Sequence, residues 1–273
     1  ALQRHVGRAA QGLAQMKQAF SWLSIAPAFS NFIGPFTAGL LIDHAGFQWA
    51  FAAMALLPVI AWVWIRQAHE LPKVEKPAGY ENNSAWDLLN EPMFRRLLMV
   101  NWFLSACWDV HTFVVPILGH ERGLSASAIG SILGVFALAA AFIRMMMPFI
   151  AARLHEWQVV TGAMLITSFM LAVYPFTETA WLMGACSVLV GLSLGGVQPM
   201  IMSTLHQITP EHRHGEALGL RLMGINASSV LMPMVFGAAG TVIGISGVFW
   251  CVSAVVGLGS RSAYQLRVHK KSE

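Results

Sequence analysis

The chain has 273 residues, of which 56% are hydrophobic and only 11% carry a charge, and its mean hydropathy is +0.59. Soluble domains contain about 25% charged residues, so this composition excludes an ordinary soluble domain. The net charge of +4 would suit nucleic acid, but the positions of the basic residues assign it to membrane topology instead, so no nucleic-acid partner is expected.

Eight apolar stretches occupy most of the chain, and each is long enough to cross a bilayer. A hydrocarbon core about 30 Å thick needs roughly 20 residues in a helix. Continuous runs of this length favour helices over barrel strands, because backbone polar groups in lipid must be satisfied within the segment. The predicted fold class is therefore all-α integral membrane, with eight transmembrane helices at 20–42, 49–65, 97–118, 127–150, 158–175, 181–205, 216–240 and 242–260.

The basic residues alternate between the two sides of these predicted spans. Fourteen Lys and Arg residues fall in the termini and in every second loop, whereas Arg122 is alone in the opposite loops. This asymmetry is typical of the positive-inside rule, so we expect both ends of the chain on the cytoplasmic side of the lipid bilayer.

A polar connector over 66–95 separates two predicted spans from six, and an internal repeat explains this uneven division. Parallel repeats of six helices mark one large transporter fold. The first two spans therefore look like the end of a six-helix half whose first four helices are missing upstream of Ala1. Three residues recur after a shift of 198 residues, Pro35, Gly39 and Gly46 as Pro233, Gly237 and Gly244.

The predicted organisation follows from the connector and the repeat. Residues 1–66 are the end of the N-terminal half, and 67–95 are a cytoplasmic central loop. Residues 96–262 are the C-terminal six-helix half, and 263–273 are a cytoplasmic tail.

Several motifs resemble the Major Facilitator Superfamily, with the chain read as helices five to twelve of a twelve-helix protein. The segment Ser30-Asn-Phe-Ile-Gly34-Pro35-Phe-Thr-Ala38-Gly39 is similar to the helix-five motif of the drug/proton antiporter branch. The segment Gly191-Leu-Ser-Leu-Gly195-Gly-Val-Gln198-Pro199 resembles helix ten of bacterial members. The resemblance implies a bacterial inner-membrane transporter that needs no cofactor and has protons and a small-molecule substrate as partners.

Asp109 is the only acidic residue deep within a predicted span. On a helical wheel it shares one arc with Asn101, Ser105, Trp108, Thr112 and Pro116. Charges at membrane depth cost a few kcal/mol and mark functional sites by default. We therefore interpret Asp109 as a proton-coupling or cation-binding group, with a structural hydrogen bond or ion pair as the alternative.

Further polar residues are weaker candidates for the same site. His111, at the flank of the arc, is a candidate proton relay or a packing residue. Three neutral amides at depth would bind substrate or join helices through hydrogen bonds. They are Asn31, Gln198 and Asn226.

Small residues and prolines predict where helices kink or approach closely. The candidate packing and gating residues are Ser30, Gly34, Pro35, Gly39, Gly191, Gly195, Pro233 and Gly237. Arg144, Arg153 and Arg221 are assigned to the cytoplasmic loop side, where Arg144 is expected to snorkel or form a salt bridge.

Three classes of function remain open at this stage. The first is proton-coupled export of small organic molecules or drugs by alternating access, with uptake symport of sugars, organic acids or aromatic compounds as its alternative. The second is a non-transporting sensor or scaffold. The third is a membrane enzyme built on His212, His214, Glu211 and Glu216, although the chain lacks the usual catalytic motifs and its three cysteines predict no metal site.

Overall fold

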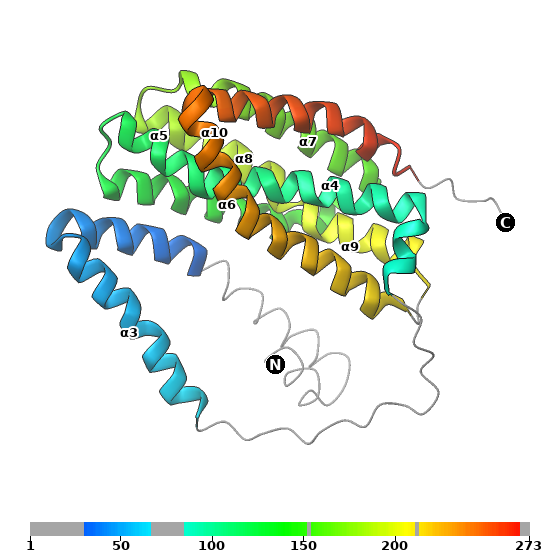
Figure 1. Ribbon diagram of the computed structural model, residues 1–273, viewed down its shortest axis with the longest axis horizontal. Coiled ribbons are helices and arrows are strands. Elements are labelled where there is room, and N and C mark those ends of the chain that lie inside the picture. Colours follow the sequence, from blue (N-terminus) through cyan, green and yellow to red (C-terminus); the bar gives the residue numbers. More distant parts are fainter. Residues whose placement is uncertain (1–29, 67–84, 152–153, 211–212, 268–273) are drawn as a thin grey trace.

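The computed structural model describes residues 30–66, 85–151, 154–210 and 213–267, and this part of the chain is helical, without a strand (Figure 1). The apolar runs form helices because only helices satisfy every backbone group within one segment. The helices are 30–45, α3 (Phe47–Ile65), α4 (Pro92–Asp109), α5 (Val115–Glu121), α6 (Ala126–Ala151), α7 (Glu156–Val173), α8 (Ala180–Gly195), α9 (Val197–Ile208) and α10 (His214–Tyr264). Three short segments join them, namely η1 (Ala85–Asn90), the π-helical η2 (Val110–Val114) and η3 (Tyr174–Phe176).

Six helices in the described ranges are long and apolar enough to cross a membrane. The segments α4, η2 and α5 form one span, Pro92–Glu121, and α8 with α9 form another, Ala180–Ile208. The first expected span is described only as the short helix over 30–45, and the last two expected spans fall within α10. The expected number of eight spans therefore stays a prediction.

The helix α10 changes direction at Gly244. Its 51 residues would extend about 77 Å at 1.5 Å per residue, far more than a bilayer core of about 30 Å. Gly244 has φ 74° and ψ 165°, and Figure 1 shows the orange and red parts of α10 meeting at an angle and diverging from the turn.

The same backbone conformation occurs 198 residues earlier. Gly46, between the helix over 30–45 and α3, has φ 84° and ψ 169°. A positive φ of this kind is readily adopted only by glycine. The internal repeat seen in the sequence therefore reappears in the backbone, at the two turns that its glycines form.

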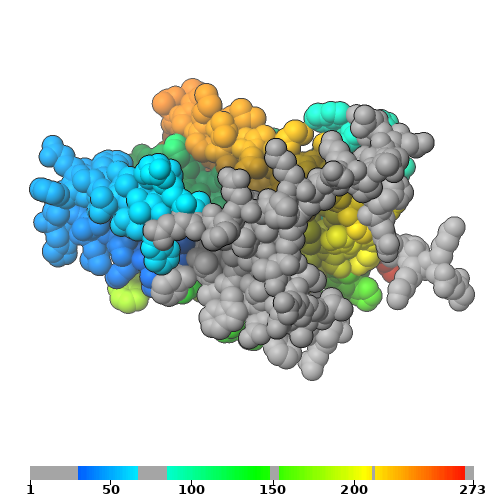
Figure 2. Space-filling view, turned by 90° about the horizontal axis from the view of Figure 1, so that it is seen from below, coloured from blue at the N-terminus to red at the C-terminus, as the bar shows by residue number. Residues whose placement is uncertain are grey.

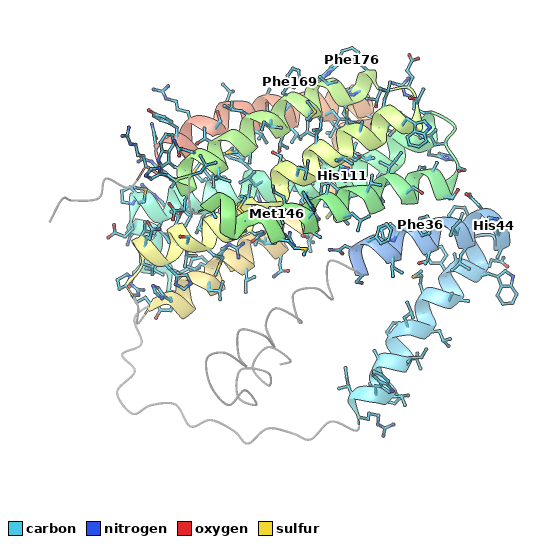
Figure 3. All side chains as sticks on the ribbon, turned by 180° about the vertical axis from the view of Figure 1, so that it is seen from behind. Phe36, His44, His111, Met146, Phe169 and Phe176 are labelled. Carbon is cyan, nitrogen blue, oxygen red and sulfur yellow. The ribbon has the colours of Figure 1, made fainter. Side chains whose placement is uncertain are left out.

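The bundle that holds the core is made of α4–α10 with η2, and residues 30–66 occupy one end of the molecule (Figure 2). Phe169 and Phe176 project outward from the bundle with 63% and 69% of their surface exposed (Figure 3). Apolar side chains on the outside fit a surface that faces lipid. In α3 the buried residue is Ala50, and Figure 1 shows this helix standing away from the bundle.

The helix over 30–45 contacts α6 through backbone and through one carboxylate. A Cβ atom on Gly39 would clash with the backbone of Ala126, so only glycine permits this approach. Asp43 accepts hydrogen bonds from the backbone nitrogens of Ala126 (3.0 Å) and Ser127 (2.8 Å). Asp43 therefore caps two of the N–H groups that the start of α6 leaves without helical partners.

The contact between α6 and α8 also depends on glycine. A Cβ atom on Gly195 would lie 2.5 Å from the carbonyl oxygen of Ala140, and one on Gly191 would clash with the carbonyl of Phe136. Small residues let membrane helices approach to backbone contact, which is where their association gains van der Waals energy.

We expect Gly195→Ala to destabilise the protein, by about 1–3 kcal/mol, because the added methyl group forces α8 away from α6. The matched control is Gly184→Ala in the same helix, where a Cβ atom would meet nothing within 4 Å. Thermal unfolding in detergent measures both. An equal response of the two variants would show that the close approach does not depend on Gly195.

Asp43 gives a prediction on pH. Hydrogen bonds from Ser127 hold the pKa of this carboxyl below its ordinary value of 3.8. The capping contribution is therefore complete above pH 3.8 and is lost as the pH falls through the lower, folded-state pKa. Asp43→Asn should lower the unfolding midpoint at pH 7, and the difference from wild type should shrink below pH 3.8.

The control for this experiment is Glu121→Gln, which removes an exposed carboxylate at the end of α5. If Asp43→Asn and wild type differ by the same amount at every pH, the charge of Asp43 does not contribute to the cap.

Candidate functional site

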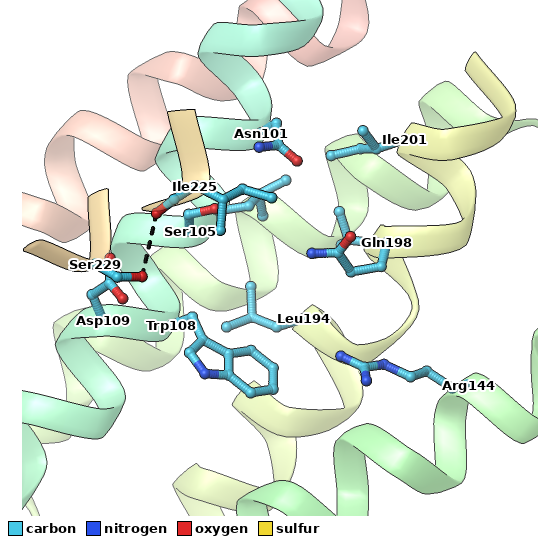
Figure 4. Close-up of a pocket in the computed structure, with 12 residues that line it drawn as sticks. Asn101, Ser105, Trp108, Asp109, Arg144, Leu194, Gln198, Ile201, Ile225 and Ser229 are labelled. Carbon is cyan, nitrogen blue, oxygen red and sulfur yellow. Dashed lines mark hydrogen bonds between the residues drawn. The ribbon is translucent and has the colours of Figure 1, made fainter. Parts of the chain in front are cut away.

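A cavity of about 270 Å³ lies between α4, α6, the α8–α9 junction and α10 (Figure 4). Its wall combines a few polar groups with apolar side chains, the usual composition of a small-molecule site. The apolar residues include Leu194, Ile201 and Ile225. The polar and aromatic ones are Asn101, Ser105, Trp108, Asp109, Arg144, Gln198 and Ser229.

Asp109 reaches this cavity from the end of α4. Its side chain is 8% exposed, and its Oδ2 accepts a hydrogen bond of 2.7 Å from the hydroxyl of Ser228 on α10. Within the described ranges no Lys, Arg or His nitrogen forms a salt bridge with it. The carboxyl group is thus held by a neutral donor in a largely buried position, a condition under which it can take up a proton.

The predicted polar stripe lies along the cavity up to Asp109 and leaves it at Thr112. Asn101, Ser105 and Trp108 line the cavity with Asp109, whereas Thr112 turns its hydroxyl to the carbonyl of Trp108 (3.0 Å). The physical reason is η2, because a π-helical turn carries more residues than an α-helical one and rotates every later side chain. A wheel drawn at a constant angle cannot follow this shift.

His111 lies in the π-helical segment and points away from the cavity. It is fully buried, its ring stacks on Phe136 with 3.9 Å between centroids, and its Nε2 is 2.9 Å from the hydroxyl of Ser187. Ser187 also lies 2.7 Å from the hydroxyl of Tyr174. The alternative of a packing residue therefore describes this geometry, and the structure does not bring His111 to Asp109.

Arg221 was assigned to the loop side by its sequence, and the structure corrects this assignment. The side chain is only 4% exposed and lies inside α10. Its Nε donates to Asn101 Oδ1 (3.2 Å) and its Nη2 donates to Gln198 Oε1. Arg221 thus joins α10 to α4 and α9 and orients two amides that line the cavity.

Arg144 is corrected in the same way. It was expected to snorkel or form a salt bridge near the cytoplasmic end of its helix, whereas its guanidinium enters the cavity from α6 (Figure 4). The Nε donates to the carbonyl oxygen of Gly195 (3.2 Å), and the guanidinium carbon lies 5.8 Å from the ring centroid of Trp108. The third basic residue of that group, Arg153, is outside the described residues.

Two of the three candidate amides lie away from the cavity. Asn226 is exposed and donates to Leu222 of its own helix (2.9 Å), and Asn31 is exposed on the helix over 30–45. Ser228 and Ser229 take the place expected for Asn226. The spacing of Arg221, Ile225 and Ser228 by four and three residues puts them on one helical face, which is the signal that could have found them.

The candidate packing residues are distributed over three contacts. Gly34, Pro35 and Gly39 belong to the helix beside α6, where the carbonyl of Pro35 closely faces Gly130, while Ser30 is exposed. Gly191 and Gly195 face α6, as described above. Gly237 lines a second cavity of about 290 Å³ between α5 and α10, one turn after the half-buried Pro233.

The candidate enzyme cluster is only partly covered by the described ranges. His206 and His214 approach with 3.0 Å between their Nδ1 atoms, and Glu216 pairs with Arg213 at 2.8 Å. Glu211 and His212 are outside the described residues. Where side chains are described, no group of three or more His, Cys, Asp or Glu is placed to hold a metal ion.

The bonds of Arg221 predict a measurable coupling. Arg221→Met and Gln198→Leu should each destabilise the protein by about 1–3 kcal/mol, because each leaves a buried polar partner unpaired. The double variant should cost less than the sum of both, with an interaction energy of about 0.5–3 kcal/mol in thermal unfolding. Asn226→Leu is the control partner, and its effect should add to that of Arg221→Met.

Comparisons with known proteins agree with this architecture. The family model described as Major Facilitator Superfamily matches residues 6–233. Among solved structures, a bacterial homologue of the iron transporter ferroportin in an inward-facing state superposes with a TM-score of 0.71 at 15% sequence identity, over 97% of this chain and 66% of that protein. At this identity the likeness shows the fold alone.

A comparison with curated proteins finds no match. The chain spans less than two thirds of the length of the solved relative. The family model nevertheless covers most of the chain, and the helices are those of a multi-pass membrane protein. The chain therefore belongs to the Major Facilitator Superfamily.

Proposed function

We propose that the chain is part of a proton-coupled secondary transporter that exports small organic molecules. The observation that carries this proposal is the Asp109 carboxyl at the edge of a polar cavity, within a span of 30 residues. Transporters of this architecture bind substrate near the bilayer midplane and expose the site alternately by rocking one half against the other.

Asp109 is the group that would carry the proton. Burying a carboxylate in a membrane is expensive, and the cost falls when the group is protonated. Ser228 donates a hydrogen bond of 2.7 Å to Asp109, and Asp109 also lines a cavity that substrate can occupy. Proton and substrate would therefore meet at the same site.

Export is supported by the helix over 30–45. Its motif resembles that of drug/proton antiporters, and the Gly39 contact brings its backbone against α6. Such a contact suits a helix that closes one side of the site. The second candidate is uptake by proton symport. It is favoured by the cavity wall, since the amides of Asn101 and Gln198 beside the Trp108 ring suit hydroxylated or aromatic substrates.

A non-transporting scaffold would be expected to fill this space with bulky apolar side chains. The cavity is instead open and lined by seven polar or aromatic side chains, which supports transport. We place the protein in a bacterial inner membrane, with both ends of the chain on the cytoplasmic side, because of the basic loops. The division into 1–66, a central loop and a six-helix half is part of this proposal.

The test uses the gene that encodes this chain, together with any coding sequence upstream of Ala1, expressed in a drug-sensitive bacterial host. The measurement is cellular accumulation of fluorescent organic cations, anions and neutral compounds, with and without an uncoupler. Export predicts reduced accumulation that the uncoupler restores, and uptake predicts increased accumulation that the uncoupler abolishes. Asp109→Asn should abolish either effect, because the amide cannot carry the proton.

The matched control is Asp87→Asn, the same chemical change at an exposed residue of η1 outside the cavity. It should transport like the wild type. Uncoupler-sensitive transport that survives Asp109→Asn would remove Asp109 from the coupling path, and accumulation unchanged for every compound would refute transport of this substrate class.

A further inference from the structure

Arg144 is an exposed residue of α6, and the partners of its guanidinium in the described part of the chain are uncharged. Its Nε bonds a backbone carbonyl and its face lies over Trp108, both uncharged. In the described ranges no carboxylate oxygen lies within 4.0 Å of its guanidinium nitrogens, so Arg144 forms no salt bridge there. Its Nη groups therefore have donors to offer to a molecule in the cavity, and Figure 4 shows them directed there.

Arg221 is a second guanidinium whose partners are uncharged. It also lacks a carboxylate partner in the described part of the chain and donates to the amide oxygens of Asn101 and Gln198. Its bonds orient those amides and leave its positive charge uncompensated. The cavity wall and its supporting residues thus hold two guanidinium groups and one carboxyl group, Asp109, so the site has an excess of positive charge.

We propose that this cavity binds a small organic anion, whose carboxylate pairs with the guanidinium of Arg144. The inference rests on the proposed transport function, since it names the substrate class of the same site, and it favours the second candidate direction, uptake by proton symport, over export. Arginine presents a planar fork of donors that matches a carboxylate in a bidentate pair, and charge-assisted bonds of this kind are the stronger ones.

The rest of the cavity defines the shape of the anion. Trp108 supports the guanidinium with its ring and is itself held by an edge contact with Phe136, at 4.7 Å between centroids. Leu194 and Ile201 form an apolar wall beside them. A volume of about 270 Å³ is just below the usual range for drug-sized ligands, about 300–1,000 Å³. The ligand is therefore a compact monocarboxylate with an apolar or aromatic body.

The test is a binding measurement on the purified protein in detergent, without a proton gradient. Acetate, pyruvate, benzoate and 4-hydroxybenzoate are the carboxylates, and benzamide and benzylammonium are the neutral and cationic counterparts of benzoate. A ligand that binds the folded state raises the unfolding midpoint with concentration. We expect at least one carboxylate to stabilise the wild type more than both counterparts do.

Arg144 variants identify the contact. Arg144→Gln should raise the carboxylate concentration for half-maximal stabilisation at least tenfold, and Arg144→Lys should lose less, because it keeps the charge without the planar fork. The matched control is Arg96→Gln, an exposed arginine at the start of α4, which should leave binding unchanged.

Three outcomes would overturn the proposal. They are stabilisation by benzylammonium or benzamide but by no carboxylate, stabilisation by none of the six compounds, and carboxylate binding that Arg144→Gln leaves unchanged. If Arg144→Gln does not fold, Trp108→Leu provides the second variant, since it removes the ring that supports the guanidinium and should weaken carboxylate binding.

The outcome is separable from that of the proposed function. Carboxylate binding through Arg144 can hold while transport proves independent of the proton gradient or of Asp109, in which case only the coupling proposal fails. Conversely, gradient-driven transport of cations with no carboxylate binding leaves the coupling proposal intact and refutes the anion.

Discussion

The structure around the cavity depends on one electrostatic constraint. A charge placed within a membrane must be compensated or solvated by protein groups, because lipid tails offer neither an opposite charge nor a hydrogen-bond partner. Here the three ionisable groups at the cavity do not compensate one another in the described ranges. Asp109 bonds the Ser228 hydroxyl, while Arg144 and Arg221 bond neutral oxygens of Gly195, Asn101 and Gln198. The position of each group is therefore set by dipoles from a neighbouring helix.

This arrangement explains why the helix contacts are so close. The carbonyl of Gly195 reaches Arg144 because α8 lies against the backbone of α6, and that approach requires a residue without a Cβ atom. Ser228 meets Asp109, and Arg221 meets Asn101, because α10 runs beside α4. The glycine contacts and the polar contacts thus support each other, and a shift of one helix would remove a hydrogen bond from one of these ionisable groups.

Much of this could be predicted from the sequence, since the bilayer imposes length and apolar composition on every span. The helical class, the family and the part of the stripe from Asn101 to Asp109 follow from such periodic signals. The π-helical turn at Val110–Val114 could not be foreseen, because it depends on tertiary packing that no single-helix pattern records. Asn226 was placed by depth alone, and depth does not say which face of a helix meets a neighbour. His111 was placed by a helical wheel with a constant angle, which fails at the π-helical turn.

The two arginines show a different limit. The positive-inside rule assigns a basic residue near the end of a span to the cytoplasmic side, and this is correct for most basic residues. The sign of another role for Arg221 was its spacing of seven residues from Ser228, which puts both on one helical face. Deciding that role requires knowing which oxygens lie opposite. In the structure these oxygens belong to the amides of Asn101 and Gln198. They hold the guanidinium of Arg221 beside the cavity instead of in a loop.

Substrate charge and direction of coupling are linked through this positive excess. A proton on Asp109 makes the cavity more positive, so it strengthens the binding of an anion beside Arg144 and weakens that of a cation. Ligands that strengthen each other's binding occupy the site together and cross together, as symport requires. Ligands that weaken each other's binding exchange, as antiport requires. An anionic substrate would therefore favour uptake with the proton, and a cationic one would favour export against it, so the charge of the bound molecule selects between the two directions proposed for this cavity.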